Sequence, residues 1–186
     1  MATSQEIIEK QKDILIRLME MYNELGLNTR ELINEFKAMK ILEEPLWKIP
    51  EANGKSNQRY ISAGVKNIRQ VLDDNNIKNR RNAKSIWTDT QLKKAFEQIP
   101  NLLPSLDLNH YKVQLEHVVE RKVIIDLILE NPGNILEIVN QNNVGCLVLE
   151  SEHNQLPNEL YDDNDIWVRY RGNIRVWDRC SKKWVF

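Results

Sequence analysis

The sequence predicts an α+β protein with a mainly helical N-terminal half, a small ββα-like unit in its second half and a C-terminal β-hairpin. Three observations support this fold class. Apolar residues recur at helical spacing through the first 50 positions, and short β-branched runs follow after residue 110. Near the end of the chain, a Gly172-Asn173 turn signal lies between two alternating segments.

The first 50 residues are expected to form a helical hairpin. Thr3 and Glu6 have the spacing of a capping box, which begins a helix that Gly26 should end. A second helix is expected from about residue 29 to 42, and Pro45 and Pro50 should end this section. The apolar stripe of such a pair serves either as core or as a dimer surface, so we expect a possible homodimer through these N-terminal helices.

Residues 51–110 are expected to form a basic helical region, with a helix over 61–73 and a basic loop over 74–84. From Asn53 to Lys94 there are ten Lys or Arg residues against three Asp or Glu residues. Such an excess favours contacts with a polyanion, although a solvated surface has the same composition. The candidate phosphate-binding residues of the loop are Lys78, Arg80, Arg81 and Lys84.

Residues 111–186 are expected to form a ββα-like core that ends in the hairpin. The pattern predicts a strand within 111–119, a segment at 122–129 that fits helical spacing, a short helix at 135–139 and a strand at 144–149. Ser151 is expected to cap a helix that carries Glu152 and His153.

The hairpin is predicted to pair residues 166–171 with residues 174–178. Its arginines alternate with tryptophans, a pattern that can contact phosphates and stack on bases. The same pattern also suits a sheet face on which arginine stems cover an apolar core. The candidate nucleic-acid-binding residues here are Arg169, Arg171 and Arg175.

Composition narrows the class of protein. A chain of 186 residues with 41% hydrophobic and 28% charged residues is typical of a single soluble domain with a real core. No apolar run approaches the roughly 18 residues of a membrane helix, and the N-terminus lacks the apolar core of a signal peptide. Two cysteines make no disulfide framework. We therefore expect a cytoplasmic protein without a membrane partner.

The residues with the most chemical content are Glu116, His117, Asn143 and His153. An acid–histidine pair ends one apolar run, an asparagine opens the next, and a histidine lies just beyond it. That order of groups is able to hold one divalent metal ion and one general base beside a phosphate.

This segment, about residues 115–155, resembles the HNH (ββα-metal, His-Me finger) endonuclease family. Glu116-His117 resembles the acid–histidine pair that ends the family's first strand, and Asn143 resembles the asparagine that opens its second strand. The stretch from Leu149 to Asn154 is similar to the family's helix block with both cysteines absent. The resemblance implies a metal-dependent endonuclease that hydrolyses DNA, plausibly a restriction or defence enzyme.

The resemblance also implies a function for each residue. His117 would be the general base, held in the correct tautomer by Asn143 or, alternatively, by Asn142. Glu116 and His153 would bind a divalent metal, and mixed oxygen and nitrogen ligands suit Mg²⁺ or Mn²⁺. Arg121, four residues after His117, is a candidate for steadying the scissile phosphate.

Other functions remain open. A non-catalytic DNA-binding or regulatory protein could keep a worn version of the site, and a nuclease toxin could act on RNA instead of DNA. A helical interaction protein with incidental histidines would also fit, because His117 beside two valines has the pattern of a half-buried strand histidine that hydrogen-bonds to backbone.

Overall fold

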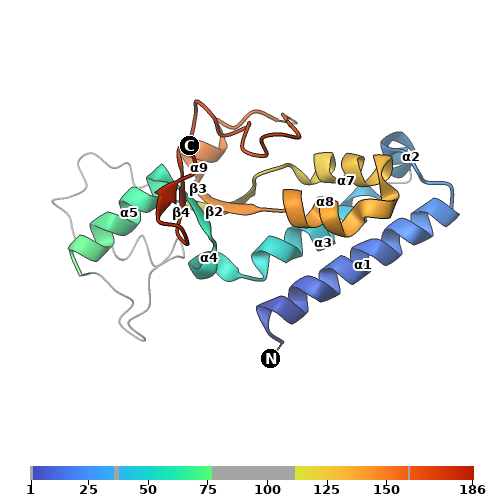
Figure 1. Cartoon of the computed structure of the whole chain (residues 1–186), viewed down its shortest axis with the longest axis horizontal. Helices are drawn as coiled ribbons and strands as arrows, with labels where there is room; N and C mark the ends of the chain where they lie inside the picture. The colour runs from blue at the N-terminus through green and yellow to red at the C-terminus, as the bar shows by residue number, and fades with distance from the viewer. Residues whose placement is uncertain (1, 36–37, 77–111, 159) are drawn as a thin grey trace. The chain divides into compact units, whose positions relative to one another are not determined.

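A computed structural model describes residues 2–35, 38–76, 112–158 and 160–186, and it confirms the α+β class (Figure 1). Helices dominate the N-terminal half, and a five-stranded mixed sheet is built from later parts of the chain and one short early strand. Two compact units interleave along the sequence. Unit 1 comprises residues 1–54, 117–144 and 157–169, and unit 2 comprises residues 55–116, 145–156 and 170–186.

Unit 1 begins with helix α1 (Ser4–Glu24), whose start is the predicted capping box. The Thr3 hydroxyl accepts a hydrogen bond from the Glu6 amide, and the Glu6 carboxylate accepts one from the Thr3 amide. After Leu25 ends the helix, Gly26 adopts a φ of +74°, a conformation that favours glycine. Local sequence alone therefore fixes both ends of this helix.

The second predicted helix is divided in the structure. Helix α2 spans Arg30–Glu35, and helix α3 spans Met39–Glu51. The expectation that Pro45 and Pro50 end the helical section was wrong, since both lie inside α3. A proline within a helix removes a backbone hydrogen bond, and here the burial of both rings in the core helps to offset that loss.

The core of unit 1 is formed where α1, α3, α7 (Arg121–Glu130) and α8 (Ile135–Asn142) pack together, with a short 3₁₀ turn, η3 (Pro132–Asn134), between the last two. The apolar stripe of α1 packs on α3 within the same chain. Dimerisation through these helices stays a prediction. The most buried core residues are Leu15, Ile33, Leu42, Leu46, Ile124, Ile125 and Ile128.

Unit 2 contains the sheet, with strand order β2-β3-β1-β4-β5. Strand β1 pairs with β3 in parallel and with β4 antiparallel, and β4 pairs antiparallel with β5. Helix α5 packs on the sheet through Val65, Ile68 and Leu72 (Figure 1). The elements are α4 (Gly54–Asn57), β1 (Tyr60–Ser62), α5 (Ala63–Asp74), β2 (Val113–His117), β3 (Gly145–Leu149), α9 (Glu150–His153), β4 (Val176–Asp178) and β5 (Lys183–Trp184).

Strands β2 and β3 run antiparallel. The Glu150 amide donates to the Lys112 carbonyl at one end of the pair, and the Val118 amide donates to the Val144 carbonyl at the other. Helix α9 follows β3 directly, so the strand–strand–helix order predicted from the sequence is present. The helix begins at Glu150 and not after Ser151, because the Glu152 carboxylate accepts the free Leu149 amide.

The C-terminal hairpin lies further along the chain than predicted. Residues 166–171 form turns, and the strands that pair at the C-terminus are β4 and β5. Asp165 explains the difference, because its carboxylate accepts the Trp167 amide and its carbonyl accepts the Val168 amide. A side chain that bonds to backbone two residues ahead stabilises a turn in place of a strand.

Within the part of the chain that the structure describes, no helix has both the length and the apolar character needed to cross a membrane. The predicted phosphate-binding residues Lys78, Arg80, Arg81 and Lys84 lie outside the described residues.

Candidate functional site

Glu116 and His153, the two predicted metal ligands, lie together in unit 2. Glu116 is on β2, and His153 is the last residue of α9. The His153 Nδ1 atom is 2.8 Å from the Glu116 Oε2 atom. The antiparallel pairing of β2 with β3, and the immediate start of α9 after β3, bring these two distant positions together.

This contact is close but is not an aligned hydrogen bond. The Nδ1 atom is buried and has no hydrogen-bond partner, although the rest of the His153 side chain is 42% exposed. We therefore regard the 2.8 Å separation as proximity of two ligand atoms and not as a formed N–H···O bond. Because the His153 Nδ1 atom is buried without a hydrogen-bond partner, it is available to bind a proton or a metal ion.

Helix α9 is held in place by Glu152, a residue to which the sequence assigned no function. Its carboxylate accepts hydrogen bonds from the Gly64 amide at 3.0 Å, the Leu149 amide at 2.8 Å and the Ser62 hydroxyl. Gly64 has to be glycine here, because a Cβ atom would lie 2.7 Å from the Glu152 Oε1 atom. Glu152 thereby ties His153 to the start of α5.

Carboxylates also dominate the electrostatics beneath this pair. Cys146 on β3 is fully buried, and burial raises the pKa of its thiol well above the usual value, with further increases from the charges of Glu152 and Glu116. The carboxylates of Glu116 and Glu152 therefore both act on the same end of β3. Among the described residues, however, no cluster of three or more His, Cys, Asp or Glu side chains is suited to hold a metal ion.

His117, the predicted general base, is buried in unit 1 with only 4% of its surface exposed. Its Nε2 atom is 3.2 Å from the Leu46 carbonyl oxygen, and its ring lies 5.3 Å from the Trp47 ring. Because a carbonyl only accepts, Nε2 carries the proton of the neutral ring. The pKa of His117 is lowered to about 4, mainly by burial and to a smaller extent by the charges of Arg121 and Arg169.

These surroundings are those of the alternative set out from the sequence, a buried histidine that hydrogen-bonds to backbone. A base is most effective when its pKa lies near the working pH, and a pKa of about 4 is far from neutrality. His117 is therefore better suited to a structural function in unit 1 than to accepting a proton from water.

Asn143 does not orient His117 through its amide oxygen, as the sequence had suggested. Its Nδ2 atom donates to the same Leu46 carbonyl at 3.0 Å, while its Oδ1 atom is buried without a hydrogen-bond partner. The alternative, Asn142, is engaged elsewhere, because its Oδ1 atom accepts from the Tyr161 hydroxyl at 3.2 Å. Both asparagines thus join parts of unit 1 to each other.

Two of the predicted phosphate-binding arginines have intramolecular partners in unit 1. Arg121 forms an ion pair with Glu43 at 3.3 Å and lies over the Trp47 ring. Arg169 is only 2% exposed, and it donates to the carbonyls of Pro157 and His117 and pairs with Glu120 at 3.0 Å. A guanidinium buried among these acceptors presents no face to a phosphate, so Arg169 is a structural residue.

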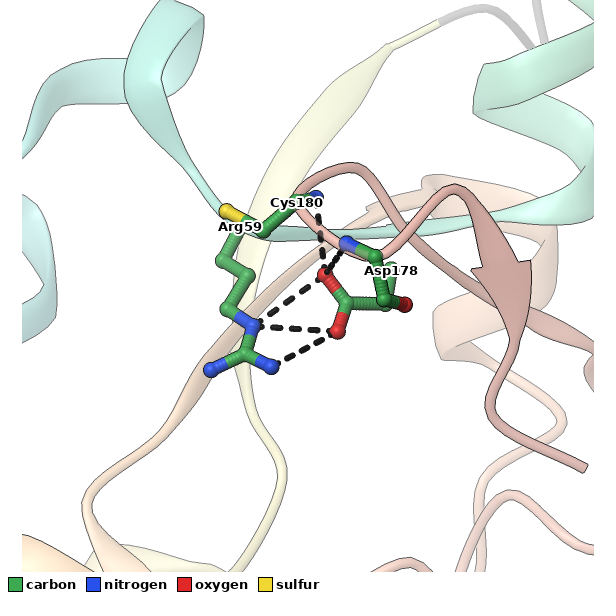
Figure 2. A network of polar contacts seen from close by, with 4 residues as sticks. Arg59, Asp178 and Cys180 are labelled. Atoms are coloured by element: carbon green, nitrogen blue, oxygen red, sulfur yellow. Dashed lines mark hydrogen bonds and ion pairs between the residues drawn. The ribbon is translucent and has the colours of Figure 1, made fainter.

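Figure 2 shows a second structural network, in unit 2. The Asp178 carboxylate binds the fork of Arg59, with 2.7 Å between the Asp178 Oδ2 and Arg59 Nη2 atoms, and accepts the Cys180 amide at 2.9 Å. Arg59 holds the pKa of Asp178 well below its usual range, because the pair stabilises the ionised carboxyl. This network fixes the turn between β4 and β5.

Arg171 and Arg175, the other predicted hairpin arginines, are both exposed. Arg171 lies over the Phe186 ring at 4.9 Å, and Arg175 lies over the Trp184 ring at 4.0 Å. The pairing of β4 with β5 places Trp184 opposite Trp177. Sequence reasoning did not include Trp184 in the hairpin, because it centred the turn at residues 172–173, about eight residues before the centre of the observed β4–β5 pairing.

Comparison of the chain with protein-family models, with curated proteins and with solved structures finds no match.

Proposed function

We propose that this chain is a metal-dependent enzyme that hydrolyses nucleic-acid phosphodiester bonds, with Glu116 and His153 as its metal ligands. The observation that carries the proposal is the 2.8 Å separation of Glu116 Oε2 and His153 Nδ1, with the ring nitrogen buried and without a hydrogen-bond partner. The residue order around this pair, which is similar to that of HNH endonucleases, supplies the reaction type.

The donor set fits a hard divalent ion. Neighbouring ligands of an octahedral Mg²⁺ ion, each bound at roughly 2.1 Å, lie about 3 Å apart, which is close to the separation found here. Mg²⁺ is commonly held by one or two protein ligands, with water and substrate phosphate completing its shell, so two protein ligands are sufficient. Such an ion would stabilise negative charge on the scissile phosphate.

Neighbouring residues hold the two proposed metal ligands in position. Glu152 fixes α9 and hence His153, while strand pairing with β3 fixes Glu116. His117 is the next residue after Glu116, but its hydrogen bond to the Leu46 carbonyl belongs to unit 1. In this proposal His117 is not the general base, and no other residue is assigned to that role.

The first test is Mn²⁺ binding, measured by isothermal titration calorimetry with wild type, Glu116→Gln and His153→Gln. Each substitution should weaken binding at least about 10-fold, as loss of a direct ligand does. Glu150→Gln is the matched control, since Glu150 is on the same short helix but pairs with Lys112 at the surface. Equal affinity in all four proteins would remove the metal assignment.

The second test is nicking of supercoiled plasmid with Mg²⁺ or Mn²⁺ and with EDTA as the metal-free control. Activity should require metal and should be lost in both ligand variants. An RNA substrate run in parallel identifies the nucleic acid, because cleavage of RNA without cleavage of DNA would assign the chain to the nuclease-toxin class.

A second candidate function is nucleic-acid binding without cleavage, and the burial of His117 favours it. A nuclease that relies on histidine as its base would lose rate by about 10²-fold or more when that histidine is replaced. If wild type binds Mn²⁺ and DNA but leaves the plasmid supercoiled, this second candidate replaces the first.

A further inference from the structure

Unit 2 presents a cluster of aromatic rings and cations that the metal pair does not involve. We call it the tryptophan–arginine surface, and it consists of Lys66, Arg175, Trp177 and Trp184. We propose that this surface binds single-stranded nucleic acid, with bases stacked on its rings and phosphates bound by its cations.

Strand register creates the surface. Ile61 on β1 is opposite Trp177 on β4, which in turn is opposite Trp184 on β5. Directly paired residues project from the same face of a sheet, so these three side chains form one row. The row begins in the core under α5 at Ile61 and reaches the sheet edge at Trp184, which is only partly buried. The indole rings of Trp177 and Trp184 thus continue the row of side chains from the core to the surface.

Each of the two indole rings has a cationic side chain over its face. The Trp177 and Trp184 ring centroids are 5.2 Å apart at an interplanar angle of 76°. The Lys66 ammonium lies 4.8 Å from the Trp177 centroid, and the Arg175 guanidinium carbon lies 4.0 Å from the Trp184 centroid. A guanidinium that covers an indole has a second planar face on its outer side, and that face is able to stack on a base while its N–H groups bind phosphate.

The charge of this segment is unbalanced. Residues 171–186 contain five Lys or Arg side chains and one acidic side chain, that of Asp178. That carboxylate is 7% exposed and already binds Arg59 and backbone amides (Figure 2), so it neutralises none of the surface cations. Within the described ranges, Lys66 and Arg175 form no ion pair with a carboxylate. The surface therefore offers positive charge to an external anion.

Single-stranded nucleic acid fits these features better than an acidic peptide does. Both would satisfy the cations, but only the nucleic acid brings a planar base for every charge, and the surface alternates rings with cations. Duplex DNA keeps its bases stacked on one another and so cannot use the rings. The proposed ligand is a strand of a few unpaired nucleotides.

The experiment is fluorescence anisotropy with a labelled oligothymidine of about 15 nucleotides, a size that covers a typical single-strand site. A duplex of the same length and polyglutamate serve as competing ligands. All measurements are made in EDTA, so that the result does not depend on the metal pair. Wild type should bind the single strand at least about 10-fold more tightly than either competitor.

Arg175→Gln should weaken binding of the single strand about 10-fold and should reduce the slope of log affinity against log salt by about 0.7, the value for one lost phosphate contact. Arg17→Gln is the matched control, because Arg17 is an exposed arginine on α1 in unit 1 and should be irrelevant to binding. Trp184→Phe, checked for folding by circular dichroism, should reduce the quenching of tryptophan fluorescence by the oligonucleotide.

Equal affinity of wild type and Arg175→Gln would overturn the proposal, as would duplex or polyglutamate bound as tightly as the single strand. This inference deepens the proposed function by adding a strand-binding surface, but its test is separate. Strand binding is titrated in EDTA and Mn²⁺ binding is titrated without nucleic acid, so a failed metal site and a failed strand-binding surface give different results.

Discussion

Replacement of His117 tests whether this histidine is a neutral core residue. His117 is 4% exposed, and burial lowers its pKa from an ordinary value of 6.5 to about 4. The unfolded chain therefore binds a proton between these two pH values that the folded chain does not bind. Because the unfolded state gains that proton, the free energy of unfolding should fall as the pH falls from about 6.5 to about 4.

The magnitude follows from the size of the shift. A difference of about 2.5 pKa units, at 1.36 kcal/mol per unit, corresponds to roughly 3 kcal/mol of stability lost over this range. The steepest slope is about 1.4 kcal/mol per pH unit, the value for one proton. At higher pH the ring is neutral in both states and contributes no pH dependence.

The assay is urea denaturation of wild type and His117→Gln at a series of pH values from about 8 to 4. Glutamine cannot titrate, but its amide can still donate to the Leu46 carbonyl. The difference in free energy of unfolding between the two proteins at about pH 8 measures the packing cost of the substitution alone. The change in that difference toward pH 4 measures the contribution of His117 protonation. Parallel stability curves for the two proteins would refute the reasoning, and so would an imidazole NMR titration of His117 with a midpoint near 6.5 in the folded protein.

Two further predictions concern unit 2. Asp178→Ala should lower the free energy of unfolding by about 2 kcal/mol in urea titrations near neutral pH, because the Cys180 and Ser181 amides and the Arg59 guanidinium lose their acceptor. Asp73→Ala, on the exposed face of α5, should cost much less. Since the pKa of Asp178 is held below its usual range, its contribution is present above about pH 4 and is lost as the pH falls below that value, which an acid series on the variant would check. Gly64→Ala should lower the free energy of unfolding by about 1–3 kcal/mol and weaken Mn²⁺ binding, because the new methyl group displaces Glu152 and with it α9. If calorimetry finds an unchanged affinity for Mn²⁺, α9 does not depend on this contact.

The parts of the fold that could be predicted are those set by near neighbours in the sequence. The start of α1 depends on two residues three positions apart, Thr3 and Glu6, and the end depends on Gly26. The proximity of Glu116 and His153 could also be predicted, although they are far apart in sequence, because the order strand, strand, helix brings these positions together.

The parts that could not be predicted depend on tertiary contacts. Pro45 remains inside a helix because its ring is buried in the core of unit 1, and no local pattern reveals that burial. His117 has the same sequence neighbours whether it is a base or a core residue. Only the position of the Leu46 carbonyl, from a distant helix, separates the two.

The hairpin arginines show why residue type and spacing alone do not identify a binding surface. Arg169 and Arg175 both alternate with aromatic residues, and the sequence treated them as equivalent. Asp165 turns the chain ahead of Arg169, and the guanidinium of Arg169 is then buried among two carbonyls and the Glu120 carboxylate. Arg175 lies immediately before strand β4, whose partner β5 carries Trp184, and its guanidinium remains at the surface over the Trp184 ring. A phosphate can reach the second arginine and not the first. The decisive property is therefore which partner satisfies each guanidinium, and that depends on one aspartate and one strand register.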